Sequence, residues 1–337
     1  MTLRSLWAPF RQLTVWLLVV LLASVTVFGS GFWSPANLQN LVVAVSIEGV
    51  MVVGMTIVMV GGGFDLSIGS VVALAGVVAV KALGLGLPIA IILAVAASGI
   101  VGIANGLLIS RLAVNPFIAT LGTMIVVRGL VLSYTDAQPV SGSDLAFMSL
   151  GRELIAGIPL PGLIFAAVLV LGHIFMAYHR TGRNIYAMGG NEESARSSGI
   201  ATGKLKVISY TICSVGAGIA GIVLASRLNT GSPIIGENTA LNVITAVLLG
   251  GTSLSGGVGS VPGSLAGLLC IGVLGNGLNL FDVSPYYQRI AQGLLLLALV
   301  ILERLARQDM GRIGRNFAMM VASWRKASLP QQNQEIS

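Results

Sequence analysis

The sequence is poor in charged residues, which make up 9% of the chain, whereas apolar residues make up 55%. Ordinary soluble domains carry roughly 25% charged residues. A soluble protein of 337 residues would expose far more surface than so few charged side chains could cover. The composition therefore excludes an ordinary soluble domain and predicts a protein whose solvent is lipid.

Cysteine and histidine are also scarce, with two residues of each. Cys213 and Cys270 lie inside apolar runs, and their spacing fits neither a disulfide framework nor a metal site, so we expect small buried hydrophobic side chains. His173 and His179 lie at the end of one apolar run, where no nearby carboxylate or cysteine completes a metal site. We therefore expect no metal and no cofactor.

Motifs for hydrolysis and for nucleic-acid binding are missing as well. The net charge of +7 comes without clusters of aromatic and basic residues, and the usual cytoplasmic excess of Lys and Arg in membrane proteins explains it. No Gly-rich segment continues into the Lys-Ser/Thr of a phosphate loop, and no zinc-protease or serine-hydrolase motif occurs with a usable His. The sequence thus predicts a membrane protein that is not an enzyme and has no ATPase of its own.

Apolar runs long enough to cross a membrane recur along the chain. We predict an all-α fold, a polytopic membrane helical bundle of about ten transmembrane helices. The third and eighth spans are short and rich in Gly and Ser, as broken or re-entrant helices are. The predicted spans are Leu13–Ser30, Leu38–Val60, Ser67–Ala82, Leu87–Ile109, Pro116–Tyr134, Pro161–Ala177, Leu205–Ala225, Ala240–Leu254, Val261–Leu280 and Tyr286–Leu302.

Lys and Arg are distributed asymmetrically between these spans. With the N-terminus inside, the outer side holds only Lys81, Arg152, Arg227 and Arg289, and Arg128 lies within a span. The positive-inside rule then places both termini in the cytoplasm. The inner side holds Arg4, Arg11, Arg111, Arg180, Arg183, Arg196, Lys204, Lys206, Arg304, Arg307, Arg312, Arg315, Arg325 and Lys326.

The predicted organisation is a cytoplasmic N-terminus at residues 1–12, a transmembrane domain at 13–303 and a basic cytoplasmic tail at 304–337. A cytoplasmic loop at 179–204 interrupts the transmembrane domain. A cleaved signal peptide is the alternative for the first span, but the uncharged stretch of residues 12–47 is too long for a typical signal sequence. In the tail, cations interleave with apolar side chains, which suits a helix lying on anionic lipid.

Glycine is abundant, with 44 residues, and two Gly-rich segments interrupt the spans at residues 61–70 and 250–260. Such breaks can line a cavity with backbone polar groups. Each break is followed by a similar run of Ser, Ala and Gly, which either a weak internal repeat or a chance resemblance explains. In the predicted topology both breaks face the same side of the membrane.

The most polar segment between two apolar runs covers residues 189–200. Asn191 precedes Glu192 and Glu193, Arg196 follows, and Gly199 comes after them, a pattern typical of a short capped helix. A short, mixed-charge helix on the basic face of a membrane protein indicates a docking site for a partner. A merely solvated loop helix is the alternative.

Two ionisable residues, Glu48 and Arg128, lie within apolar spans. A charge at the bilayer centre costs about 2.5–3.5 kcal/mol on insertion scales, so each should face the bundle interior or pair, with each other as one option. A structural pair and a proton or substrate path both remain open. Asp65 precedes the third span, where we expect an N-cap rather than a substrate contact. The amides Asn105, Asn276 and Asn279 either bridge helices or offer weak polar contacts to a solute.

Several segments resemble the permease subunits of ribose-type sugar ABC importers. Residues 63–70 (Gly-Phe-Asp-Leu-Ser-Ile-Gly-Ser) resemble a Gly-Ile-Asp-Leu-Ser-Val-Gly-Ser motif of that family. Residues 191–200 resemble its cytoplasmic Asn-Glu-Ala-Ala-Arg-x-Ser-Gly-Ile segment, and 115–124, 248–257 and 276–280 match further blocks in the family's order. The resemblance covers roughly residues 38–302. Val258 departs from it, since the family usually has Arg or Lys there, and the tail from Arg304 is longer than usual.

The resemblance implies a translocation subunit in the bacterial inner membrane, powered by a separate ABC ATPase subunit. It implies a second permease copy, identical or a close paralogue, and a periplasmic binding protein that delivers a monosaccharide or related polyol. The implied ATPase-coupling residues are Gly190, Asn191, Glu192, Glu193, Ala195, Arg196 and Gly199. Candidates for the translocation path or its gating are Glu48, Asp65, Asn105, Asn115, Arg128, Asn276 and Asn279.

Two rival functions remain open. A branched-chain amino-acid ABC permease is the first, against which the sugar-type motifs argue. A self-contained secondary transporter is the second, and it should show intramembrane acids that couple an ion, of which only Glu48 qualifies.

Overall fold

The computed structural model describes residues 31–304, together with residues 17, 19, 21–23 and 26. The first predicted span lies largely outside the described residues, and the predicted basic tail lies almost wholly outside them. The chain forms two compact units, residues 1–289 and 290–337, and the described part of the second, residues 290–304, is helical.

Among the described residues, eight helices are long and apolar enough to cross a membrane. They match the second to seventh, ninth and tenth predicted spans, so the predicted polytopic helical fold is confirmed. They are α3 (Pro35–Val60), α4 (Ile68–Ala82) extended by the 3-10 helix η1 (Leu83–Leu85), α5 (Leu87–Arg111), α6 (Pro116–Thr135), α8 (Leu160–Tyr178), α11 (Thr202–Leu228), α13 (Val261–Leu280) and the helix Pro285–Arg304.

The eighth predicted span is the exception. Its helix, α12 (Thr239–Leu249), has only 11 residues, about 16 Å at 1.5 Å per residue, and therefore cannot cross a bilayer alone. The helix stops because the chain turns at Gly250 and Gly251, and Gly251 adopts a φ of +83°, a conformation that disfavours other residues.

The core of the first unit is built around α11, which packs against α3, α4 and α5. Small residues allow this close approach. A Cβ atom on Gly102 of α5 would lie 2.7 Å from the Cα atom of Thr211, and one on Gly106 would lie 2.5 Å from the Cα atom of Val207. Membrane helices associate through such close packing, because lipid provides no hydrophobic drive between them.

The opposite surfaces of α5 and α6 expose large apolar side chains. Ile100 is 66% exposed, and Ile118 and Ile125 are 64% and 62% exposed. In water such a surface would be unfavourable, but in hydrocarbon it is the expected lipid-facing or partner-facing side of a membrane helix.

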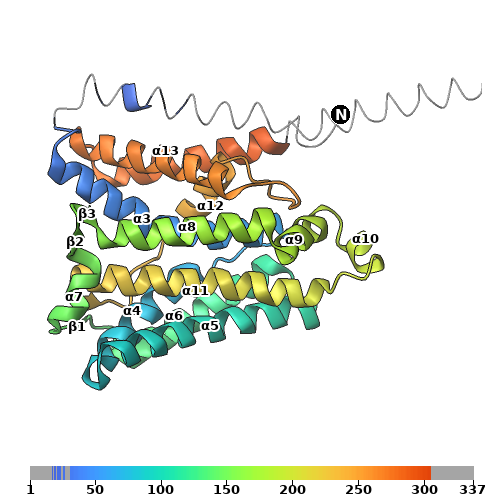
Figure 1. Ribbon diagram of the computed structural model, residues 1–337, viewed down its shortest axis with the longest axis horizontal. Helices are drawn as coiled ribbons and strands as arrows, with labels where there is room; N and C mark the ends of the chain where they lie inside the picture. The colour runs from blue at the N-terminus through green and yellow to red at the C-terminus, as the bar shows by residue number, and fades with distance from the viewer. Residues whose placement is uncertain (1–16, 18, 20, 24–25, 27–30, 305–337) are drawn as a thin grey trace, which may run out of the picture. The chain divides into compact units, whose positions relative to one another are not determined.

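One end of the first unit carries α7 (Leu145–Arg152) and is called the α7 end below (Figure 1). Phe147 of α7 is fully buried, and its carbonyl accepts a hydrogen bond of 2.5 Å from the Ser226 hydroxyl on α11. Two antiparallel strand pairs complete this end: β1 (Val140–Ser141) with β4 (Thr230–Gly231), Val140 opposite Gly231, and β2 (Leu154–Ile155) with β3 (Ile158–Pro159), Leu154 opposite Pro159.

The other end carries α9 (Arg180–Gly190) and α10 (Glu192–Ser197), which lie beyond the ends of α8 and α11, and is called the α10 end (Figure 1). Asn191 alone separates the two helices. The end of α9, the connecting residue Asn191 and helix α10 therefore place the predicted docking residues together at this end.

Residues 232–249, called the re-entrant segment below, run from the α7 end back into the bundle. Gly236 meets the start of α4, because a Cβ atom built on it would lie 2.3 Å from the carbonyl oxygen of Gly69. After α12, the loop of residues 250–260 reaches the α10 end, where the Gly257 N–H donates to the Val60 carbonyl at 2.8 Å. The helices α4 and α12 therefore begin near each other and diverge toward opposite ends.

Candidate functional site

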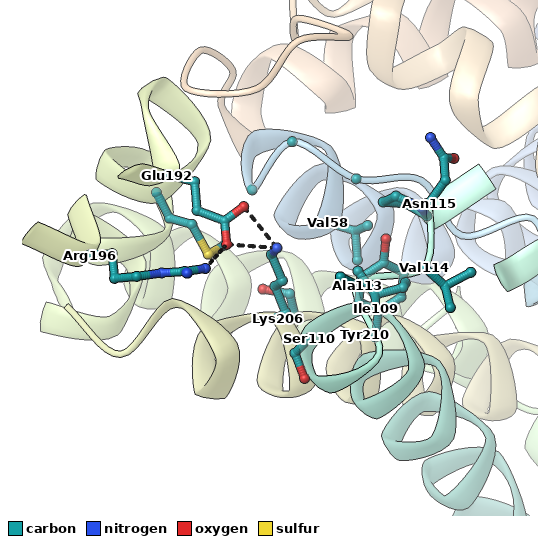
Figure 2. Close-up of a pocket in the computed structure, with 16 residues that line it drawn as sticks. Val58, Ile109, Ser110, Ala113, Val114, Asn115, Glu192, Arg196, Lys206 and Tyr210 are labelled. Atoms are coloured by element: carbon teal, nitrogen blue, oxygen red, sulfur yellow. Dashed lines mark hydrogen bonds and ion pairs between the residues drawn. The ribbon is translucent and has the colours of Figure 1, made fainter. Parts of the chain in front are cut away.

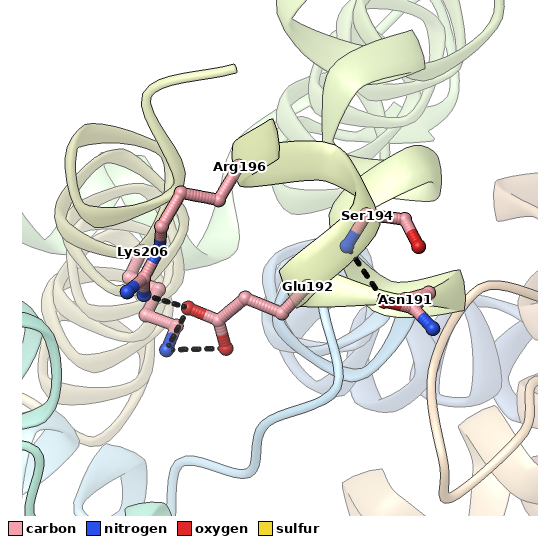
Figure 3. Close-up of polar contacts among 5 residues, drawn as sticks. All are labelled: Asn191, Glu192, Ser194, Arg196 and Lys206. Atoms are coloured by element: carbon pink, nitrogen blue, oxygen red, sulfur yellow. Dashed lines mark hydrogen bonds and ion pairs between the residues drawn. The ribbon is translucent and has the colours of Figure 1, made fainter. Parts of the chain in front are cut away.

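The helix α10 is fixed at both ends by local hydrogen bonds. At its start, the Asn191 side-chain oxygen accepts from the Ser194 N–H at 2.8 Å (Figure 3). At its end, Gly199 adopts a φ of +80°, and the Ile200 N–H donates to the Ala195 carbonyl at 3.1 Å, which is a Schellman motif. The predicted cap and the predicted stop are both confirmed.

An ion-pair cluster fastens α10 to α11. The Glu192 carboxylate lies 2.7 Å from the Lys206 ammonium of α11 and 3.2 Å from the Arg196 guanidinium one turn along α10 (Figure 3). Burial raises the pKa of Glu192, but the hydrogen bond and charge of Lys206, with smaller contributions from Thr202 and Arg196, outweigh it and lower this pKa below its usual value. Glu192 is therefore ionised at neutral pH and holds α10 in place.

Two side chains of α10 are exposed to solvent, where a partner could contact them. Ala195 is 5% exposed and seats α10 on the unit, whereas the Arg196 side chain is 72% exposed and Glu193 is exposed beside it. A rigid, capped helix thus presents both charge signs outward at the α10 end.

A pocket of about 390 Å³ opens beside α10 (Figure 2). Glu192 and Lys206 lie on one side of it. The α3–α4 break at residues 61–63 and the α5–α6 loop also line it, together with further residues of α3, α5, α9 and α11. Asn115 belongs to that loop, caps α6 by accepting from the Phe117 N–H at 2.9 Å, and lines the pocket. The gating candidate Asn115 therefore lies near the coupling residues.

Asp65 is fully buried between α3 and α4. Its carboxylate accepts from the Ser67 N–H at 2.9 Å, from the Ser67 hydroxyl at 2.5 Å and from the Ser214 hydroxyl of α11 at 3.4 Å. The N-cap residue of α4 is Ser67, so the expectation that Asp65 itself is the cap was wrong by two positions. Asn105 of α5 donates to the same Ser67 hydroxyl at 2.9 Å, which joins these two candidates in one buried polar cluster.

Glu48 and Arg128 do not pair with each other, so the option of a mutual pair was wrong. Arg128 of α6 donates to the backbone carbonyls of Pro233, of Ile235 at 2.8 Å and of Gly69 at 3.3 Å. Glu48 of α3 hydrogen-bonds the side chain of Asn242 in α12. Both ionisable residues therefore hold the re-entrant segment, one at its turn and one on its helix.

The last two candidates lie at the α7 end. Asn276 of α13 and Asn37 of α3 exchange two side-chain hydrogen bonds of 2.8 and 3.0 Å. The Asn279 side-chain oxygen accepts from the Gln288 amide at 2.8 Å. Asn276 therefore bridges two helices and Asn279 ties α13 to the segment that follows it.

Several polar partners that the structure reveals could not be predicted from the sequence. Lys206 lies 14 residues from Glu192 along the chain and belongs to a different helix, so helical periodicity does not relate the two. Asn242 reads as one more polar residue in an apolar run, and Glu237, which is close enough to Arg128 to attract it, reads as a loop residue. Only knowledge of how the helices pack could have connected these residues.

Comparison with known proteins identifies the family. The family model described as "Branched-chain amino acid transport system / permease component" matches residues 37–300. The chain is 42% identical to the ribose import permease protein RbsC of Bacillus subtilis, over 85% of this chain and 90% of the relative. It is 38% identical to the L-arabinose transport system permease protein AraH of Escherichia coli, over 89% and 91%.

A third relative, the D-allose transport system permease protein AlsC of Escherichia coli, is 35% identical over 85% of this chain and 90% of the relative. No solved structure matches the chain. The chain belongs to this family of transport-system permease components and is a multi-pass protein of the bacterial inner membrane.

Proposed function

We propose that the chain is the membrane subunit of an ATP-driven importer that carries a monosaccharide or a related polyol. The relatives named for ribose, L-arabinose and D-allose support a sugar cargo. The description of the family model supports a second candidate, a branched-chain amino acid. We favour the sugar, because three relatives of 35% identity or more that cover most of the chain carry sugar names.

The observation that carries the proposal is α10. A six-residue helix held by its own cap, its own stop and a salt bridge to α11 is a rigid projection, and its outward face is charged. We propose that this face docks on a separate ATP-binding subunit, which supplies the energy. The coupling residues predicted from the sequence, Gly190 to Gly199, all belong to this projection or its flanks.

The α10 end then faces the cytoplasm. The cations Arg111, Arg180 and Lys204 lie at or next to this end, whereas fewer cations, among them Lys81 and Arg152, lie at the α7 end. The positive-inside rule supports this orientation, and with it the cytoplasmic placement of both termini. The α7 end then faces the periplasm, where a sugar-binding protein would deliver its cargo.

The solute path, in this proposal, runs beside the re-entrant segment against a second permease copy. Sugars are uncharged and need weak polar contacts rather than a charged site. Glu237 and Asn238 are exposed at the turn held by Arg128, and a carboxylate there would be costly against lipid. These residues, with Glu48 and Arg128, are therefore the gating candidates that we favour.

Reconstituted transport tests the function. The chain is placed in lipid vesicles with its ATP-binding subunit and its binding protein, and uptake of labelled ribose, L-arabinose, D-allose and leucine is measured with and without ATP. We expect accumulation of a sugar that requires ATP and all components. Accumulation of leucine alone would establish the second candidate, and accumulation by the chain alone would show a self-contained transporter.

A matched pair of variants tests the docking surface. Glu193→Ala removes an exposed carboxylate from α10, and Glu153→Ala removes one from the α7 end. We expect Glu193→Ala, combined with Arg196→Ala, to weaken copurification of the ATP-binding subunit, while Glu153→Ala leaves it unchanged. Equal copurification in both cases would contradict docking at α10.

A further inference from the structure

Three backbone segments meet at the α10 end with no side chain between them. They are the end of α3 with the first Gly-rich break, the end of α9, and the second Gly-rich break. We call Gly62, Gly189, Gly256 and Gly257 the glycine junction. Its centre is the hydrogen bond from the Gly257 N–H to the Val60 carbonyl.

The distances at the junction leave no room for a methyl group. A Cβ atom on Gly189 would lie 1.8 Å from the Val60 carbonyl oxygen and 2.7 Å from the Gly257 nitrogen. One on Gly256 would lie 2.8 Å from both the Gly189 carbonyl oxygen and the Gly62 Cα atom. Because backbone touches backbone, side-chain rotation cannot absorb a displacement of one segment, and the neighbouring segments must move with it.

A glycine in another helix behaves differently. A Cβ atom on Gly122 of α6 would meet nothing within 4 Å. Gly122 and Gly189 both lie in helices, and they differ in what surrounds them. They form a matched pair for experiment.

A side chain strengthens the connection between α9 and the second break. The Tyr186 hydroxyl of α9 donates to the Gly259 carbonyl at 2.9 Å. Because only Asn191 separates α9 from α10, a displacement of α10 also displaces α9, and α9 contacts the glycine junction through Gly189. The Glu192–Lys206 ion pair is a separate route from α10 into α11.

Each break adjoins a helix that starts inside the bundle. The first break continues through Asp65 to α4, and the second break begins where α12 ends. The other end of α12 follows the turn that Arg128 holds. The junction therefore connects the α10 projection to α4 and to the short helix α12.

We infer that the glycine junction transmits displacement of α10 to α4 and α12, with Gly189 and Tyr186 as positioning residues. This inference rests on the proposed docking of an ATP-binding subunit at α10. In this inference the two Gly-rich breaks move together when α10 is displaced, because both of them contact α9 at the glycine junction.

The test compares Gly189→Ala, Gly122→Ala and Tyr186→Phe in the assembled importer. We expect Gly189→Ala to keep copurification and basal ATP hydrolysis, but to lose sugar uptake and its stimulation of hydrolysis by about 5- to 150-fold, the range of typical coupling between sites. Tyr186→Phe should produce a smaller loss in the same two measurements, and Gly122→Ala should match the unaltered protein. A purely structural role would instead lower assembly and uptake in parallel.

A labelling measurement covers the case in which Gly189→Ala does not assemble. Ser255 is exposed in the second break, so Ser255→Cys, with Cys213 and Cys270 replaced by Ser, reports movement there. We expect its thiol-labelling rate in the assembled importer to change between the nucleotide-free and the ATP-trapped states, and Tyr186→Phe to reduce that change.

Two results would overturn the inference: wild-type uptake by Gly189→Ala, or one labelling rate for Ser255→Cys in both nucleotide states. These results differ from a failure of the proposed function. If no ATP-binding subunit copurifies with the unaltered chain, docking itself is wrong, whereas ATP-driven uptake with neutral junction variants removes only the junction's role.

Discussion

Helix α10 and the re-entrant segment differ in what determines their structure. Within α10, the cap from Asn191 and the stop at Gly199 come from residues of the same short stretch. The turn of the re-entrant segment, by contrast, is held by Arg128, which lies 105 residues from Pro233 along the chain. The structure of α10 is therefore determined by neighbouring residues in the sequence, whereas that of the re-entrant segment depends on how distant helices pack.

This difference suits the two roles that we propose. A docking helix must keep its shape while it is pushed, and local caps give it that shape independently of the bundle. A gate must change partners, and a segment held by a few long-range polar contacts can do so without unfolding a helix.

Arg128→Met should have the largest effect. It removes a guanidinium that binds three backbone carbonyls, and hydrogen bonds to charged groups contribute about 1.5–3 kcal/mol each. We expect a loss of about 3 kcal/mol or more in the free energy of unfolding. Thermal unfolding in detergent measures it, with the exposed Arg196→Met as the matched control that should melt like the unaltered protein. Equal melting temperatures for the two variants would show that the re-entrant segment is stable without Arg128.

Asn191→Ala should have an intermediate effect that is confined to α10. Loss of an N-cap typically costs about 1 kcal/mol, and a six-residue helix has little else to stabilise it. Amide hydrogen exchange across residues 192–197 should become faster. Asn115→Ala removes the same kind of cap from α6, where packing holds the rest of the helix, so only the first turn should respond. Unchanged exchange in α10 would mean that the bundle rather than the cap forms it.

The smallest effect should come from acid. The pKa of Glu192 in the folded protein lies below its usual value of 4.5, so its stabilising ion pair is fully present above about pH 4.5 and is lost as the pH falls through the lowered pKa. Because the pair is partly exposed, we expect less than about 1 kcal/mol. Protection factors of α10 amides should be constant from neutral pH to about pH 5 and should fall below that range. Glu192→Gln should remove this dependence, and an identical fall in that variant would assign it to other groups.

The sequence predicted most of the bundle and the docking helix, because both depend on local signals. Long apolar runs specify spans, and Asn191 and Gly199 specify where α10 starts and stops. It did not predict the partners of Glu48 and Arg128, because an ionisable residue in an apolar span shows that a partner is needed but not which one. Lys206 was identified only as an inner-side cation for the same reason.

The two Gly-rich breaks illustrate the same limit. Their composition indicated interrupted helices, and their predicted common side agrees with the contact of Gly62 with Gly256. Their direct contact with Gly189 could not be read from composition. Three backbone segments can meet this closely only when the residues at the contact lack a Cβ atom. Many other glycines in this chain make no such contact, so a glycine in the sequence does not by itself identify the meeting point.

Crosslinking from opposite ends tests the central claim most directly. A photoreactive residue replaces the exposed Arg196 on α10 in one variant and the exposed Leu154 of β2 at the α7 end in another, in cells that make the whole importer. The account predicts a crosslink to the ATP-binding subunit from position 196 and none from position 154. A crosslink to that subunit from position 154, with none from 196, would contradict it.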